Sequence, residues 1–179
     1  EKHFGYEIFK NKFGIIGLGR IGKILAGYLS SFGAEVSYYD PKEILLPTGN
    51  SITKKNSIES LIQDSNIILL CASYTPKDNP IINETIIDAM KNKFFINTSR
   101  GELIDEEYLM DKIEEDHFKG IALDVISNET GTNRLSKMIT LTKEKNFIIT
   151  PHIGGATYDS INATEMFIVE KLTTYLTKL

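Results

Sequence analysis

Cysteine, long apolar runs and positive charge are scarce in this sequence, and each scarcity excludes a class of protein. The single cysteine, Cys71, cannot form an intramolecular disulfide; it constrains the redox compartment little, and a reducing cytoplasm fits best. The longest apolar runs, such as 67–72, fall far short of the roughly 20 residues of a transmembrane helix, and no signal-peptide pattern opens the chain. We therefore expect a cytoplasmic location and no membrane partner.

The charge balance argues against a nucleic-acid partner. Lysine and arginine together number 20, against 24 acidic residues, and the net charge is -4. Binding to a phosphate backbone requires a clustered basic surface, which this chain does not offer. The only arginines are Arg20, Arg100 and Arg134. Because lysine cannot reproduce the planar fork of a guanidinium, the positions of these few arginines are informative.

The composition is that of an ordinary globular domain. The chain has 179 residues, of which 41% are hydrophobic and 25% charged, enough for one domain with a sizeable core. It opens at Glu1 without an initiator methionine, so we expect a piece of a longer protein. No internal repeat or low-complexity tract interrupts it. The polar segment 128–137 is expected to be an irregular loop.

Short apolar runs alternate with segments of helical spacing along the chain. The runs are rich in β-branched residues, which predicts strands buried on both faces. The alternation predicts an α/β fold, a Rossmann-type doubly wound parallel sheet with helices on both faces. The predicted strands are 13–16, 36–39, 67–71, 94–96, 121–123 and 147–149. The last segment, about 158–179, predicts a helix longer than a crossover requires, which could leave the domain.

A glycine-rich turn follows the first predicted strand and opens the first predicted helix. Gly17 permits the tight turn, Gly19 lets the backbone approach a pyrophosphate, and Gly22 lets helix and strand pack closely. The pyrophosphate would lie on the helix N-terminus, where unpaired N–H groups and the macrodipole favour negative charge. Arg20 can add a charge-assisted contact. This context predicts a dinucleotide cofactor.

Asp40 ends the second predicted strand, where dinucleotide-binding domains place an acid for the adenosine ribose. Its carboxylate can accept hydrogen bonds from both ribose hydroxyls and would repel a 2′-phosphate. The sequence therefore favours NAD over NADP. Lys42, close behind Asp40, could partly accommodate a phosphate, so acceptance of NADP stays open.

Four segments in this order resemble the signature segments of the D-isomer-specific 2-hydroxyacid dehydrogenases. They are 14–22, which holds the glycine turn, 97–105 after the fourth predicted strand, 122–125 closing the fifth, and 150–157 closing the sixth. The resemblance covers essentially the whole chain. It implies a Rossmann-type cofactor domain whose separate substrate domain is absent here, with residues 1–179 forming the NAD-binding domain and the last helix leading back to the substrate domain.

The resemblance implies a proton-relay site made of Arg100, Glu129 and His152. Arg100 would bind the substrate carboxylate and polarise its carbonyl, His152 would be the general acid/base, and Glu129 would be the acidic partner of His152. The chemistry of the residue types agrees, because an imidazole titrates near neutral pH, a neighbouring carboxylate favours imidazolium, and a guanidinium fork matches a planar carboxylate. The family commonly has proline after this acid, whereas this chain has Thr130.

The resemblance also implies a set of cofactor contacts along the carboxyl edge of the sheet. Asp124 would lie near the nicotinamide carboxamide, Thr98 and Ser99 near the nicotinamide ribose, and the turn at Gly154 and Gly155 near the ring. The full predicted cofactor set is Gly17, Gly19, Arg20, Ile21, Gly22, Asp40, Ser73, Thr98, Ser99, Arg100, Asp124, His152, Gly154 and Gly155. No metal site is predicted.

The function that follows is an NAD-dependent oxidoreductase that interconverts a small D-2-hydroxy acid and its 2-keto acid. Phosphoglycerate, glycerate or hydroxypyruvate, and lactate-type acids are the substrates the resemblance allows, and a homodimer through the cofactor domain is the implied assembly. The alternative is a non-catalytic NAD-sensing dimerisation module that resembles the corepressors of this fold. A formate dehydrogenase is disfavoured, because those enzymes pair the histidine with glutamine and this chain has Glu129.

Overall fold

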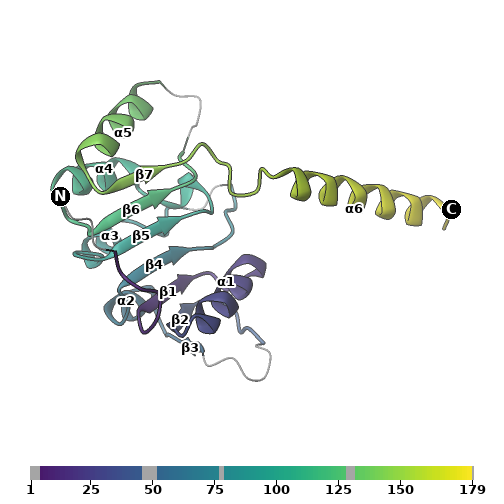
Figure 1. Ribbon diagram of the computed structural model, residues 1–179, viewed down its shortest axis with the longest axis horizontal. Coiled ribbons are helices and arrows are strands. Elements are labelled where there is room, and N and C mark those ends of the chain that lie inside the picture. The colour runs from purple at the N-terminus through teal and green to yellow at the C-terminus, as the bar shows by residue number, and fades with distance from the viewer. Residues whose placement is uncertain (1–4, 46–51, 77–78, 128–131, 179) are drawn as a thin grey trace.

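The computed structural model describes residues 5–45, 52–76, 79–127 and 132–178. Within them the chain forms one seven-stranded sheet, all of whose neighbouring strands are parallel, in the order β3-β2-β1-β4-β5-β6-β7 (Figure 1). The strands are β1 (Lys12–Ile16), β2 (Glu35–Tyr39), β3 (Ile52–Lys54), β4 (Ile67–Leu70), β5 (Phe94–Asn97), β6 (Gly120–Leu123) and β7 (Phe147–Ile149). The predicted doubly wound fold is confirmed.

Helices cover both faces of the sheet, as the doubly buried strands require. On one face α1 packs through Ala26 and Leu29 against β1 and β2. On the other face α2 to α5 share a larger core that includes the fully buried Phe95. The helices are α1 (Arg20–Ser31), α2 (Ile58–Gln63), α3 (Glu84–Ala89), α4 (Glu106–Glu114), α5 (Thr132–Glu144) and α6 (Tyr158–Leu176), with a short 3-10 helix, η1, at Gly101–Leu103.

Two elements differ from the sequence prediction. The edge strand β3 was not predicted, because its three residues include one apolar side chain, Ile52. The segment 128–137 was predicted as an irregular loop, which is wrong from Thr132 onward, where α5 begins. Met138 and Leu141 of this helix are buried in the core, so tertiary packing stabilises a helix whose first residues are polar.

The strand order places a topological switch point between β1 and β4. The chain proceeds from β1 outward to β2 and β3, then returns to β4 on the other side of β1 and continues outward to β7. Because all the strands are parallel, the turns that follow β1, β4, β5, β6 and β7 meet at one edge of the sheet. Open α/β sheets bind their ligands at this carboxyl edge, beside the switch point.

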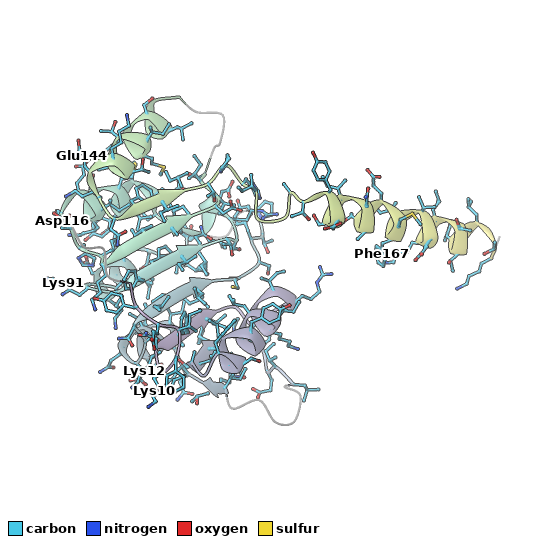
Figure 2. All side chains as sticks on the ribbon, viewed as in Figure 1. Lys10, Lys12, Lys91, Asp116, Glu144 and Phe167 are labelled. Carbon is cyan, nitrogen blue, oxygen red and sulfur yellow. The ribbon has the colours of Figure 1, made fainter. Side chains whose placement is uncertain are left out.

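The last helix, α6, projects away from the sheet and carries the C-terminus far from it (Figure 1). It begins with a capping box in which Thr157 and Ser160 exchange hydrogen bonds. None of its residues is buried, and Phe167 stands out from the helix in the open (Figure 2). Among the described helices, none has both the length and the apolar character that a membrane span demands.

Candidate active site

The turn after β1 is as tight as its glycines predict. Gly17 has a φ of 91°, a region that favours glycine, and its N–H donates to the carbonyl of Tyr39 at 2.8 Å. A Cβ on Gly17 would lie 2.6 Å from the Cα of Ala72, at the end of β4, and one on Gly22 would overlap the carbonyl oxygen of Gly17. Both glycines are therefore required by packing within the domain itself.

The N-terminus of α1 has room and donors for an anion. Gly19 is the N-cap, makes no side-chain cap hydrogen bond, and has open space where a Cβ would stand. The first turn contains no acidic residue, and the side chains of Arg20 and Ile21 are exposed. Uncapped N–H groups at the positive end of a twelve-residue helix suit a pyrophosphate. The predicted dinucleotide therefore fits this turn without displacing any protein atom at Gly19.

Asp40 has a role that the sequence did not reveal. One carboxylate oxygen accepts the N–H of Leu18 in the glycine turn at 2.9 Å, and the other accepts the N–H of Lys42 at 2.9 Å. The acid thus fixes the turn that would hold the pyrophosphate. A carboxylate has about four lone-pair positions, so capacity remains for both ribose hydroxyls.

The turn after β5 is organised by Asn97, a fully buried residue that was not predicted as part of the site. Its Oδ1 accepts the N–H of Ser99 at 2.9 Å, and its Nδ2 donates to the carbonyl of Arg100 at 3.0 Å. The hydroxyl of Ser99 donates to the carbonyl of Ala72, which joins this turn to the end of β4. In the sequence, an asparagine at the end of an apolar strand and before a polar turn was the signal that could have indicated this role.

The predicted ligand-binding side chains on these turns are presented outward. Arg100, Thr98 and Ser73 are exposed, and Arg100 Nη1 donates to the carbonyl of Ser99 at 2.7 Å. Cys71, between the glycine turn and Ser73, is different, because burial raises the pKa of its thiol to about 11. It is therefore a neutral packing residue at physiological pH.

Asp124, directly after β6, binds the turn that carries His152. Its carboxylate accepts the hydroxyl of Thr150, the N–H of Ile153 at 3.0 Å and the N–H of Gly154 at 2.8 Å. Partial burial acts to raise the pKa of Asp124, but these hydrogen bonds and the nearby His152 outweigh it, so the pKa lies below its ordinary value. Asp124 is therefore ionised near neutral pH.

His152 stands at the tip of this turn in an uncommon backbone conformation. Its φ is 53°, its N–H donates to the carbonyl of Thr150 at 3.0 Å, and its side chain is exposed. A left-handed non-glycine residue costs free energy, so the surrounding hydrogen bonds must hold it in place. A Cβ on Gly154 would lie 2.9 Å from Asp124 Oδ2, whereas Gly155 has open space.

The structure brings most of the predicted site residues to one edge, with one exception. Backbone hydrogen bonds link successive strand ends, from Asp124 to Asn97 at 2.9 Å and from Thr150 to Leu123 at 2.9 Å. Arg100 and His152 thus follow strands that flank β6. Glu129 lies outside the described residues, so its pairing with His152 stays a prediction. In the described part of the chain, no cluster of three or more acidic, histidine or cysteine side chains could hold a metal ion.

Comparison with known proteins identifies the domain. Residues 1–154 match the family described as D-isomer specific 2-hydroxyacid dehydrogenase, NAD binding domain. The chain is 33% identical over 171 residues to D-3-phosphoglycerate dehydrogenase of Escherichia coli (strain K12), a match covering 95% of this chain and 41% of that protein. It is 31% identical over 155 residues to glyoxylate reductase of Thermococcus kodakarensis, covering 86% of this chain and 45% of that protein.

A solved structure agrees with the sequence matches. The crystal structure of D-lactate dehydrogenase from Aquifex aeolicus, complexed with NAD and lactic acid, aligns with a TM-score of 0.87 at 28% identity and covers 98% of this chain and 56% of that one. The chain spans less than half the length of the two curated relatives. With the glycine turn, Asp40 and the ordered motifs all present, this chain belongs to the D-isomer-specific 2-hydroxyacid dehydrogenase family as its NAD-binding domain.

Proposed function

We propose that the protein containing this chain is an NAD-dependent dehydrogenase that interconverts a D-2-hydroxy acid and its 2-keto acid. The family supports this reaction, and relatives named for glyoxylate, phosphoglycerate and lactate support a small 2-keto acid as substrate. Phosphoglycerate, glycerate or hydroxypyruvate, and lactate-type acids are the candidates. A cytoplasmic location is part of the same proposal and is supported by the likeness to D-3-phosphoglycerate dehydrogenases.

The observation that carries the proposal is that Arg100 and His152, both exposed, lie at the same carboxyl edge of the sheet as the glycine turn. Arg100 and His152 project from ordered turns at the carboxyl edge, each fixed by hydrogen bonds to a separate polar residue, Asn97 and Asp124. Exposed side chains on rigid backbone are suited to bind a ligand that enters from outside the domain.

The residues would divide the reaction between them. Reducing a 2-keto acid adds a hydride to the carbonyl carbon and a proton to its oxygen, and NADH, held by the glycine turn and Asp40, would supply the hydride. His152, as imidazolium, would donate the proton to that oxygen and take it back in the oxidation. Arg100 would pair with the substrate carboxylate and stabilise charge on the carbonyl oxygen. Glu129 would favour the imidazolium form of His152.

The test is NADH oxidation by the full-length protein with a panel of 2-keto acids. Activity with one or more acids is expected, and Arg100→Lys should chiefly raise KM, because one ammonium cannot reproduce the fork. Lys42→Arg, which keeps the charge of an exposed lysine at the edge, is the control and should leave KM for the keto acid unchanged. NADH binding without any turnover would favour the non-catalytic sensing module instead.

We propose further that α6 leads into a second, substrate-binding domain, so that residues 1–179 are the cofactor half of a two-domain protein. Support comes from the helix itself, whose apolar side chains, including Ile168 and Leu172, are more than half exposed. A helix that carries so much apolar surface needs a partner. The match to just over half of the solved dehydrogenase chain agrees with this division.

A homodimer through the cofactor domain completes the proposal. Ile24 and Tyr28 on α1 and Phe32 at its C-cap recur at helical spacing, and each of the three is more than half exposed. A second copy of the chain is the occupant we propose for this surface. Sedimentation of the full-length protein should give a dimer, and Tyr28→Lys should weaken it. A wild-type monomer at micromolar concentration would contradict the assignment.

A further inference from the structure

Glu106 is the one charged side chain that is buried in the described part of the chain, with 3% of its surface exposed. It opens α4, next to the N-cap Asp105, whose side chain caps the helix by accepting the N–H of Tyr108 at 3.2 Å. Burying a carboxylate is strongly unfavourable unless hydrogen bonds compensate. The positive end of the helix dipole offsets part of that cost. It does not explain why Glu106 is buried, because the neighbouring Glu107 lies in the same first turn and is exposed.

Both oxygens of Glu106 bind the same residue on another element. Oε1 accepts the backbone N–H of Ser127 at 2.6 Å, and Oε2 accepts its hydroxyl. Ser127 lies just past the end of β6, between Asp124 and Glu129 in the sequence. The carboxylate therefore fixes the point from which the chain departs toward Glu129.

The same contact abuts the turn that carries Arg100. Gly101, the next residue, is buried, and a Cβ there would overlap the backbone of Ile126 and Ser127 and lie 2.6 Å from Glu106 Oε1. The backbone of Arg100 is held from its other side by Asn97. Three segments thus meet at the Glu106 carboxylate, namely the end of the Arg100 turn, the start of α4 and the exit of β6.

We propose that Glu106 is a positioning residue for the proton-relay site, an inference that rests on the function proposed above. By holding Ser127 against Gly101, it fixes the Arg100 turn relative to the chain that leaves β6. Glu106 itself touches neither substrate nor cofactor. A misplacement of about 1 Å at such a site can cost on the order of 10²-fold in rate.

Three substitutions in the full-length protein test the proposal. Glu106→Leu removes both acceptors at similar volume, whereas Glu106→Gln can still accept the Ser127 N–H and donate to its hydroxyl. Glu107→Gln removes the same charge from the same helix turn at an exposed position and is the matched control. Steady-state kinetics with the preferred 2-keto acid, NADH affinity and urea denaturation are measured for each.

Glu106→Leu should lower kcat/KM for the keto acid by on the order of 10-fold or more. NADH affinity should fall less than kcat/KM, because the glycine turn and Asp40 lie elsewhere on the edge. Glu106→Gln should recover most of that loss, and Glu107→Gln should behave as wild type. A drop in stability without a change in kcat/KM, or a Gln variant as impaired as the Leu variant, would overturn the proposal.

Hydrogen–deuterium exchange separates this proposal from the proposed function. In Glu106→Leu, amides of 97–101 and 126–127 should exchange faster, while those of the glycine turn should not. If Glu106→Leu fails to fold, Ser127→Ala takes its place. This variant loses the hydroxyl contact to Glu106 and keeps the backbone N–H contact, so it should show a smaller change in the same segments. Unchanged exchange there would refute positioning by Glu106, even if the protein reduces 2-keto acids. A wild type without keto-acid activity would refute the proposed function instead.

Discussion

Asp124 accepts hydrogen bonds from residues on both sides of His152 in the chain. Thr150 donates from before the histidine, and the N–H groups of Ile153 and Gly154 donate from after it. The histidine backbone has a φ of 53°, which a free chain would rarely adopt. The Asp124 carboxylate, directly after β6, therefore stabilises the conformation in which the turn after β7 presents the imidazole.

Thr150→Val should destabilise the domain in a pH-dependent way, because it removes a hydroxyl donor to the ionised Asp124 at nearly constant shape. The expected loss at pH 7 is about 1 kcal/mol. The pKa of Asp124 is lowered in the folded state, so the stabilisation is present above the ordinary aspartate pKa of about 3.9. This stabilisation is lost as the pH falls through the folded-state pKa of Asp124, which lies below the ordinary pKa.

Urea denaturation of wild type and Thr150→Val at pH 7 and near pH 3 measures this effect. The two midpoints should differ at pH 7 and differ less at the lower pH, while Thr150→Ser, which keeps the hydroxyl, should stay close to wild type at both. Identical midpoints at pH 7 would show that this hydroxyl contributes no stability to the turn.

Gly19→Val should abolish NADH binding and leave the domain folded. The position has open space within the protein, so the branched side chain would instead occupy the volume that the pyrophosphate needs. Gly27→Val is the matched control, because Gly27 lies on the same helix and also has open space at its Cβ. Circular dichroism reports folding and fluorescence titration reports binding. Normal affinity in Gly19→Val would disprove the phosphate-binding role of this turn.

NADH should bind at least about tenfold more tightly than NADPH, a difference of roughly 1.4 kcal/mol. The reason is Asp40, whose ionised carboxylate would meet the 2′-phosphate of NADPH. Asp40→Asn should narrow the preference and also weaken NADH, because the same carboxylate accepts the N–H of Leu18. Calorimetry with both cofactors decides the matter, and equal wild-type affinities would point to Lys42 as a phosphate ligand.

The sheet could be predicted from the sequence because its strands are buried on both faces. Runs such as 13–16 and 67–71 are continuously apolar for that reason, and strands formed at each of them. The edge strand β3 and the helix α5 could not be predicted in the same way. Ile52 is the only apolar residue of β3. In α5, the buried apolar residues are Met138 and Leu141, whose burial depends on packing against α4 and the sheet.

The candidate site also contains features that the sequence could predict and features that it could not. The positions of Gly17, Asp40 and Arg100 after strand ends could be predicted from the sequence, and their roles toward cofactor and substrate stay predictions. The supporting contacts could not be predicted, because the bonds from Asn97 to the Arg100 turn, from Asp124 to the His152 turn and from Glu106 to Ser127 depend on tertiary packing or on local turn geometry. Long-range hydrogen bonds carry no periodicity that a sequence pattern would reveal.

Glu129→Gln is the substitution that tests the proposed relay. Reduction of a keto acid requires His152 in its protonated form, so the rate should fall as rising pH removes that proton. The carboxylate of Glu129 would favour the imidazolium, and an amide would not, so the variant should lose its proton at lower pH and the basic limb of the pH–rate profile should move toward acid. NADH affinity should barely change, because the cofactor cradle at the glycine turn is untouched.

His152→Ala provides the reference for complete loss of the acid, with a decrease on the order of 10²-fold or more at every pH. Profiles of kcat/KM for wild type and Glu129→Gln, measured across neutral pH in the full-length protein, make the comparison. Coincident basic limbs would mean that Glu129 is not the partner of His152, and that Thr130 marks a site whose loop departs from the family pattern.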